Sequence, residues 1–246
     1  PAFLNSMDSL DDWDAVIVLT ELKSRADAAL RAARAGKHLL VASPIAETAE
    51  QALELIDACR ELGLILMAGL SMRFQPSLMT IKTALSEGKL GEPGLLRIHL
   101  WQSSLIDNPY ISPQLTGGLD LANWFFSALP DTVFALAGHG YLQVHLGFPG
   151  GGMALLDLET SLPDGDSYTS VSLIGSTGAA YADDHHNRNL LFNGGAPRAI
   201  EAGLGDYCLL NQLREFVESL QANCAPQAGG EAYMQAMLVA EAVRRS

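Results

Sequence analysis

Short apolar runs alternate with segments of helical spacing over the first 70 residues. The runs DAVIVLT (14–20), KHLLVAS (37–43) and LILMAGL (64–70) indicate strands, and 24–36 and 48–63 between them indicate helices. Each helix opens with a capping-box spacing, S-x-x-D at Ser24 and T-x-x-Q at Thr48, and each ends at a glycine. Apolar strands separated by helices indicate a parallel sheet with both faces covered, so we expect a βαβαβ half of a Rossmann-like fold.

The second half of the chain is β-rich. Runs of β-branched and aromatic residues are joined by turns such as FPGGG and PDGD, and a helical stretch at 118–129 interrupts them. Helical stretches at 207–221 and 230–245 close the chain. We therefore expect an α/β chain: a partial Rossmann-like nucleotide-binding domain over 1–75, then an α+β domain with a large open antiparallel sheet over 76–246. The closing helices are able to pack back on the first domain.

The first expected strand, 14–20, leaves one edge of the sheet without a partner strand. It forms an edge of the expected three-stranded sheet, yet it is apolar along its length. Uncovered edges of this kind promote association, so upstream chain, later chain or another subunit is expected to cover it. The phosphate-binding spacing GxGxxG does not occur in this sequence.

Composition and charge narrow the possible partners. The 246 residues are 48% hydrophobic and 17% charged, which is typical of a folded globular protein. A net charge of −13 provides no basic face for nucleic acid. No apolar run approaches the roughly 18 residues of a membrane span, so we expect no membrane partner. Three widely spaced cysteines without a CxxC motif indicate reduced thiols, and hence a cytoplasmic protein.

Several stretches together resemble the Gfo/Idh/MocA oxidoreductases. They are DAVIVLT, AARAGKHLLVASPIAETAEQALELIDACRELGLILMAGLSMRFQPSL and LSEGKLGEPGLLRIHLW, with FPGGGMALLDLE and NQLREFVESLQ later in the chain. The resemblance implies a Rossmann domain that binds NAD or NADP, and a second domain with a large open sheet. It also implies hydride transfer on sugars or polyols, and dimers or tetramers formed through that sheet.

The family's functional residues do not all carry over. Ser43 occupies the position of the family lysine in VASPIAET, and a hydroxyl can position a ligand but cannot replace an acid or base. Pro44 keeps the turn, and Thr20, Ser43, Pro44 and Arg73 line the crevice that the resemblance implies. Arg25 occupies a further position where the family often has histidine. We expect no catalytic residue in the family's lysine position.

The second domain also departs from the family pattern. Aligning DLANWFF with the end of the family's D-x-G-x-H-x-x-D segment places Asp120 at its last aspartate and Gly117 at its histidine. The family's GxGxxG turn would lie before Pro1. Binding of NAD or NADP by this chain is therefore expected to be weak or absent.

The densest group of metal-capable side chains lies in YADDHHNRN. Asp183, Asp184, His185 and His186 are candidate ligands for a divalent ion. Neighbouring residues on a strand point to opposite faces, however, so one aspartate and one histidine at most share a side. A hairpin tip or an intersubunit contact is the favoured interpretation, as an interface or structural role is for His139 and His145.

Three functional hypotheses remain. The first is an oxidoreductase homologue, degenerate or truncated, that acts as an oligomeric binding or scaffold protein for a small-molecule ligand. The second is an NAD(P)-dependent sugar or polyol dehydrogenase whose N-terminal nucleotide-binding segment lies outside this chain. The third is a metal-dependent activity at Asp183–His186. Whether the chain is an enzyme is left open, although its residues argue against hydride transfer.

Overall fold

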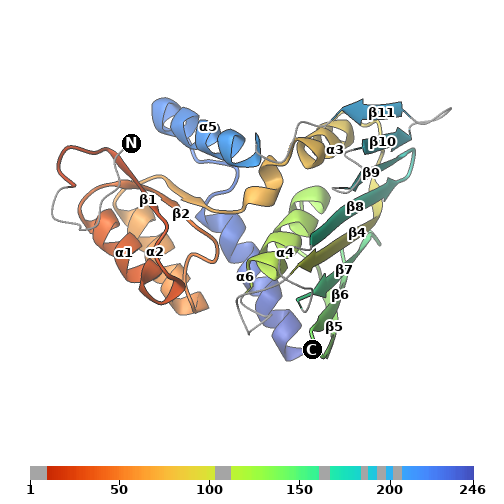
Figure 1. Ribbon diagram of the computed structural model, residues 1–246, viewed down its shortest axis with the longest axis horizontal. Coiled ribbons are helices and arrows are strands. Elements are labelled where there is room, and N and C mark those ends of the chain that lie inside the picture. Colours follow the sequence, from red (N-terminus) through yellow and green to blue (C-terminus); the bar gives the residue numbers. More distant parts are fainter. Residues whose placement is uncertain (1–9, 103–111, 161–166, 184–187, 193–197, 202–206) are drawn as a thin grey trace. The chain divides into compact units, whose positions relative to one another are not determined.

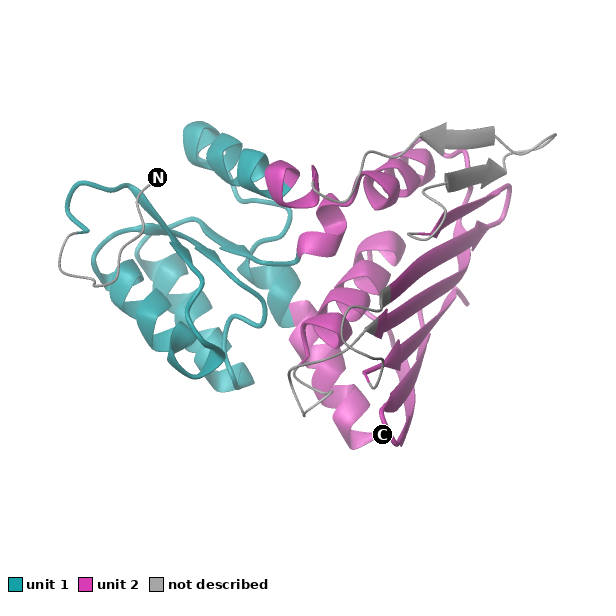
Figure 2. Cartoon of the chain, in the orientation of Figure 1, with its two compact units in different colours: residues 1–70, 212–234 teal, residues 71–211, 235–246 magenta. Residues whose placement is uncertain are grey.

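A computed structural model describes residues 10–102, 112–160, 167–183, 188–192, 198–201 and 207–246 (Figure 1). The chain forms two compact units, residues 1–70 with 212–234 and residues 71–211 with 235–246 (Figure 2). Both closing helices, α5 (Tyr207–Ala222) and α6 (Gly230–Arg245), contain a boundary between the units. No helix within the described ranges has the length and apolar character that a membrane crossing requires.

The first unit contains the expected βαβαβ arrangement. Its three strands are parallel, in the order β1-β2-β3, so β2 lies in the middle. The elements are β1 (Ala15–Val18), α1 (Leu22–Arg34), β2 (His38–Val41), α2 (Ala49–Glu61) and β3 (Leu66–Ala68). Apolar side chains of all three strands are buried beneath the helices, which is why the strands have continuous rather than alternating apolar patterns.

The two helices of this unit begin differently. In α2 the capping box is present: Thr48 accepts from the Gln51 N–H, and the Gln51 side chain accepts from the Thr48 N–H. The predicted start of α1 at Ser24 is wrong, because this helix already begins at Leu22. The Ser24 hydroxyl donates back to the Glu21 carbonyl at 3.2 Å, so Ser24 lies within the first turn and does not cap it.

The two edges of the small sheet have different surroundings. The edge of β3 is bridged by the chain near Gly229, and the Ala68 N–H donates to the Ala228 carbonyl at 2.8 Å. β1 forms the other edge, as expected from the order of the strands, and none of the described strands pairs with its outer side. Ile17 on β1 remains 45% exposed.

The second unit contains one eight-stranded sheet in the order β11-β10-β9-β8-β4-β7-β6-β5 (Figure 1). The large sheet expected from the sequence is present, but it is mixed, because β4 and β7 pair in parallel while its other pairs are antiparallel. A parallel pair needs a crossover connection, and the chain between β4 and β7, which includes α4, β5 and β6, provides it. The strands are β4 (Pro93–Gln102), β5 (Thr132–Gly138), β6 (Tyr141–Gly147), β7 (Met153–Glu159), β8 (Ser167–Gly175), β9 (Ala179–Asp183), β10 (Arg188–Phe192) and β11 (Arg198–Glu201).

One face of this sheet packs against helices. The core joins its inner side chains to α3 (Pro76–Ser86), α4 (Pro113–Phe126) and the last turns of α6, and a short 3-10 helix, η1 (Ser71–Phe74), precedes α3. The predicted start of α4 near residue 118 is too late. Ser112 caps the helix by accepting from the Leu115 N–H at 3.1 Å, and Pro113 occupies its first turn, a start signal that the following glycines obscured.

The opposite, outer face of the large sheet exposes large apolar side chains. Along β6 the outward-facing residues alternate with buried ones, as a sheet with one buried face requires. A polar group lies among them: the Asp157 carboxylate accepts from the Gln143 amide at 2.7 Å and lies 3.1 Å from His99 Nδ1. The exposed large apolar residues of the outer face lie on β4 to β9 and are Trp101, Phe134, Leu136, Tyr141, Met153, Ile174 and Tyr181.

Candidate functional site

Thr20, Ser43 and Pro44 follow the carboxyl ends of β1 and β2 in the first unit. Because these two strands are parallel and paired, their carboxyl ends lie at the same edge of the sheet. In open α/β sheets this edge is where ligands bind. The Ser43–Pro44 peptide is cis, and β2 ends immediately before this turn.

The side chain of Arg25, on the first turn of α1, joins these two strand ends. Its Nε and Nη2 donate to the Thr20 carbonyl at 3.1 and 2.7 Å, and its Nη1 donates to the Pro44 carbonyl at 2.6 Å. A longer contact of 3.5 Å reaches the Ala42 carbonyl. In the sequence Arg25 is visible only as a departure from a family histidine, because a contact between strand ends has no signature in sequence spacing.

Ser43 itself is held tightly between the ends of β2 and β3. Its hydroxyl oxygen is enclosed and has no hydrogen-bond partner among the described residues. A Cβ placed on Gly69 would lie 2.6 Å from the Ser43 nitrogen, so β3 ends on a glycine because the backbone of β2 passes so close. The hydroxyl at the family's lysine position is therefore packed into the protein.

Tyr233 supports the same turn from within the unit. Its side chain is fully buried, and its hydroxyl accepts from the Ile45 N–H at 3.2 Å. Burial raises the pKa of Tyr233 to about 12, and the hydrogen bond from Ile45 and the charge of Arg25 oppose this rise. Tyr233 was not predicted as a site residue, because it lies within the periodic apolar pattern of a core helix.

Arg73, the fourth predicted crevice residue, belongs to the second unit. It is buried and pairs with Asp120 of α4 through two hydrogen bonds, 2.7 Å from Nε and 2.6 Å from Nη2. Burial raises the pKa of the Asp120 carboxyl, and the hydrogen bonds and charge of Arg73 oppose that rise. The Arg73 guanidinium also lies 5.5 Å from the centre of the Trp124 ring.

Lys82 lies over the same Trp124 ring and was not singled out in the sequence. Its ammonium donates to the Trp124 carbonyl at 2.5 Å and to the Ser127 hydroxyl at 3.1 Å. It therefore satisfies a carbonyl in the last turn of α4, where a cation also interacts favourably with the helix dipole. Burial and the neighbouring charge of Arg73 lower the pKa of Lys82.

Gly117, which the alignment places at the family histidine, is packed against Met72. A Cβ at this position would lie 3.0 Å from the Met72 sulfur, so even a small side chain requires Met72 to move. A Cβ on the next residue, Gly118, would approach a different neighbour, Leu156, to 2.9 Å. The glycine pair thus allows α4 to pack closely against its neighbours.

The metal candidates are only partly described. Asp183 is the last residue of β9, and its carboxylate accepts from the Tyr168 hydroxyl at 3.4 Å. Asp184, His185 and His186 lie outside the described residues. Within the described ranges no three histidine, cysteine or acidic side chains form a group able to hold a metal ion.

Comparison with known proteins supports the fold. Residues 2–70 match the oxidoreductase family with an NAD-binding Rossmann fold, GFO_IDH_MocA. Over 272 aligned residues the chain is 23% identical to the uncharacterized oxidoreductase YrbE of Bacillus subtilis, covering 96% of this chain and 76% of that protein. It is 27% identical over 180 residues to an inositol 2-dehydrogenase of Rhizobium meliloti, covering 70% of this chain and 49% of that enzyme.

A solved structure extends the likeness over both units. UDP-N-acetylglucosamine 3-dehydrogenase GnnA from Acidithiobacillus ferrooxidans superposes with a TM-score of 0.87 at 21% identity, over 98% of this chain and 81% of that one. The parallel Rossmann-like sheet followed by a large mixed sheet is the two-domain architecture of a class of NAD(P)-binding oxidoreductases. Residues 2–70 are thus similar to the Gfo/Idh/MocA oxidoreductases, and the chain shares the fold of the GnnA dehydrogenase.

Proposed function

We propose that this chain is a Gfo/Idh/MocA homologue that binds a small molecule at the carboxyl edge of β1 and β2 without transferring hydride. The observation that carries the proposal is Ser43, whose enclosed hydroxyl occupies the position of the family lysine. Hydride transfer at a carbinol carbon needs a group that can exchange a proton near neutral pH, and a serine hydroxyl has no such pKa.

We further propose that the protein acts as a homo-oligomer, with the outer face of the large sheet as its contact surface. The exposed apolar side chains of that face support this proposal, because contiguous apolar patches of this kind mark interaction surfaces. Three polar side chains among them, His99, Gln143 and Asp157, are mutually hydrogen-bonded or paired. Their burial in a contact between two copies is therefore less costly than burial of isolated charges.

A direct test measures both cofactor binding and turnover. Purified protein is titrated with NADH and NADPH by calorimetry and fluorescence, and then incubated with oxidised cofactor and myo-inositol. We expect no cofactor reduction above the protein-free control. A Ser43→Lys variant in the same assay shows whether a lysine at this position is sufficient for cofactor reduction. Turnover by the unmodified protein would overturn the proposal, and micromolar binding of NADH would argue strongly against it.

A second candidate function is that of an NAD(P)-dependent sugar or polyol dehydrogenase. The match of residues 2–70 to an NAD-binding Rossmann family favours it, as does the likeness to an inositol 2-dehydrogenase. In that case a residue other than Ser43 must exchange the proton. Cofactor reduction by the unmodified protein with any polyol would select this alternative.

A further inference from the structure

Arg25 carries a positive charge at the proposed ligand edge, and its guanidinium forms no ion pair with a carboxylate among the described residues. All four hydrogen bonds of its guanidinium go to main-chain carbonyls of Thr20, Ala42 and Pro44. These carbonyls are neutral dipoles, so they satisfy the N–H groups but leave the net charge in place. The ion pair of Arg73 with Asp120 shows the contrast, since there the charge is cancelled.

Tyr233, the titratable group whose charge interacts with Arg25, does not cancel this positive charge either. Burial holds the pKa of Tyr233 at about 12, so its phenol is protonated and neutral at physiological pH. Burial also lowers the pKa of Arg25, but an arginine side chain remains protonated in proteins. The edge therefore holds a fixed, partly desolvated cation, which an incoming anion would stabilise.

Donors are available beside this charge. A guanidinium has five N–H groups, and the contacts to carbonyls leave one on Nη2, whose bond to Thr20 lies on the exposed side. The Thr20 residue is exposed, and its side-chain hydroxyl can donate alongside. The first turn of α1 adds main-chain N–H groups, because the Glu21 side chain makes no capping hydrogen bond to them.

We propose that Arg25 and Thr20 form a recognition site for an oxyanion, the carboxylate or phosphate group of a small-molecule ligand. This inference rests on the proposed function, which places the ligand at this edge, and adds the chemical class of that ligand. A lysine at such a site can both attract an anion and exchange a proton, whereas here the two roles are separate. Arg25 supplies the positive charge, but it cannot exchange a proton near neutral pH, so the site recognises an anion without acting as an acid or base.

A purely structural role for Arg25 makes a different prediction. If the guanidinium only ties the strand ends together, its removal destabilises the first unit, and oxyanions have no effect that depends on it. If the guanidinium recognises an anion, substitutions that remove positive charge at this site should also weaken anion binding, and those that remove negative charge should strengthen it. Glu21 gives an independent measure, because its exposed carboxylate follows Thr20 and opposes an anion.

The test is calorimetric titration of the full chain at constant ionic strength with inorganic phosphate, succinate and neutral myo-inositol. The variants are Arg25→Gln, Arg25→Lys and Glu21→Gln. Arg34→Gln is the matched control, because it removes one positive charge from the other end of α1, where Arg34 makes only an exposed contact of 3.5 Å with Glu54. Thermal unfolding without ligand establishes that each variant is folded before it is titrated.

We expect phosphate or succinate to bind the unmodified chain, and which of the two binds more tightly identifies the oxyanion. Arg25→Gln should weaken that binding about tenfold, the loss of one charged hydrogen bond, whereas Arg34→Gln should leave it unchanged. Arg25→Lys should retain part of the affinity, and Glu21→Gln should increase it about twofold.

Binding of neither oxyanion, or equal binding by Arg25→Gln, would overturn the inference. Binding of myo-inositol alone would also overturn it, while the proposed binding function would stand. Cofactor turnover, measured separately, tests that function instead.

Discussion

Arg25 and Arg73 represent two ways in which a folded chain accommodates a guanidinium. Arg73 is buried beside a carboxylate, so its charge and its N–H groups are both satisfied by Asp120. Arg25 is only half-buried and bonds carbonyls, so its N–H groups are largely satisfied while its charge is not. The first arrangement serves packing inside the second unit, and the second leaves a charge available at a sheet edge.

Thr116 on α4 provides a test of buried polar groups at the residue scale. The residue is fully buried, and its hydroxyl has no hydrogen-bond partner among the described residues. A buried hydroxyl without a partner costs about 1–3 kcal/mol, and valine has nearly the same shape. We expect Thr116→Val to raise the free energy of unfolding by about 1 kcal/mol in urea denaturation.

Thr80 on α3 is the matched control for this substitution. Its hydroxyl donates to the Pro76 carbonyl at 2.8 Å, so Thr80→Val removes a hydrogen bond that exists. The same chemical change should therefore leave stability unchanged or lower it by up to about 1 kcal/mol. If Thr116→Val destabilises the protein as much as Thr80→Val or more, the Thr116 hydroxyl has a stabilising partner.

At the scale of elements, the close approach of β2 and β3 depends on one glycine. A Cβ at residue 69 would meet main-chain atoms, the Ser43 nitrogen at 2.6 Å and the Ala42 Cα at 3.0 Å, and these atoms cannot rotate away. We expect Gly69→Ala to lower the free energy of unfolding by about 2–3 kcal/mol and to weaken ligand binding at the Ser43 turn. Chemical denaturation and calorimetry check the two effects separately.

Gly138→Ala on β5 is the control for this substitution, because a Cβ there meets nothing within 4 Å. It should change stability by less than about 0.5 kcal/mol. Equal stability of the Gly69→Ala and Gly138→Ala variants would contradict the close approach of the two strand ends.

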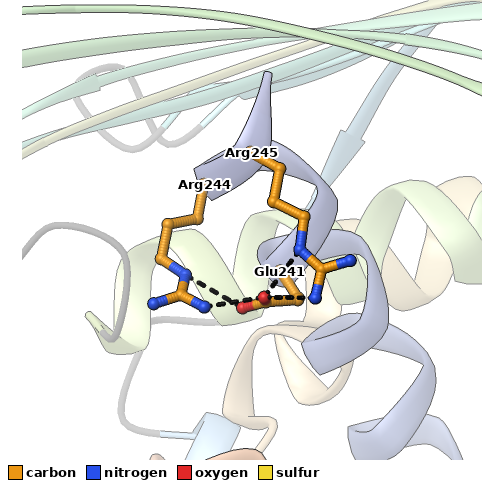
Figure 3. Close-up of polar contacts among 3 residues, drawn as sticks. All are labelled: Glu241, Arg244 and Arg245. Carbon is orange, nitrogen blue, oxygen red and sulfur yellow. Dashed lines mark hydrogen bonds and ion pairs between the residues drawn. The ribbon is translucent and has the colours of Figure 1, made fainter.

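The last turn of α6 gives a pH-dependent prediction (Figure 3). Arg244 and Arg245 both donate to the Glu241 carboxylate, and the hydrogen bonds from Arg244 are the largest cause of the lowered pKa of Glu241. A lowered folded-state pKa gives stability above the unfolded-state pKa, and this is lost as pH falls through the folded-state value. Glu241→Gln should therefore be less stable than the unmodified protein at pH 7.

The difference between Glu241→Gln and the unmodified protein should disappear in acid, below the lowered pKa of Glu241. It should also shrink in about 1 M salt, because the group is exposed and its interactions are screened. Thermal unfolding from neutral to acidic pH measures the first effect, and thermal unfolding at pH 7 with and without salt measures the second. A difference that persists unchanged in acid would mean that the carboxylate charge is not its cause.

The elements differ in how far sequence could predict them. The βαβαβ unit and the capping box at Thr48 were predictable, because strand runs and helix caps are local patterns. The parallel pairing of β4 with β7 was not, since register across a sheet depends on residues far apart in sequence. The same limit applies to the site: Ser43 follows a local motif, whereas Arg25 and Tyr233 act through contacts that only the folded chain creates.

At the scale of the whole molecule, the outer face of the large sheet predicts self-association. Phe134 and Leu136 on β5 are each at least half exposed on that face, at 50% and 56%. A double variant, Phe134→Glu with Leu136→Glu, adds charge there without changing the buried side of the strand. We expect light scattering to give a dimer or tetramer for the unmodified protein and a smaller species for the variant.

Leu62→Glu is the control for the double variant. Leu62 is 51% exposed and lies in the first unit, away from the large sheet in sequence. This substitution should leave the oligomeric state unchanged. A monomeric unmodified protein, or an oligomer that the β5 variant leaves intact, would remove the outer face as the contact surface.

The parallel pairing of β4 with β7 also has a consequence for the order in which the chain is made and folded. β4 pairs on one side with β7 and on the other with β8, so Ile98 lies between Leu156 and Val171. During synthesis β4 emerges long before either neighbour, whereas β5, β6 and β7 form a hairpin series from adjacent segments. Non-local pairing is the slow part of folding. In pulse-labelling hydrogen exchange during refolding, the amides of β6 should therefore become protected before those of β4.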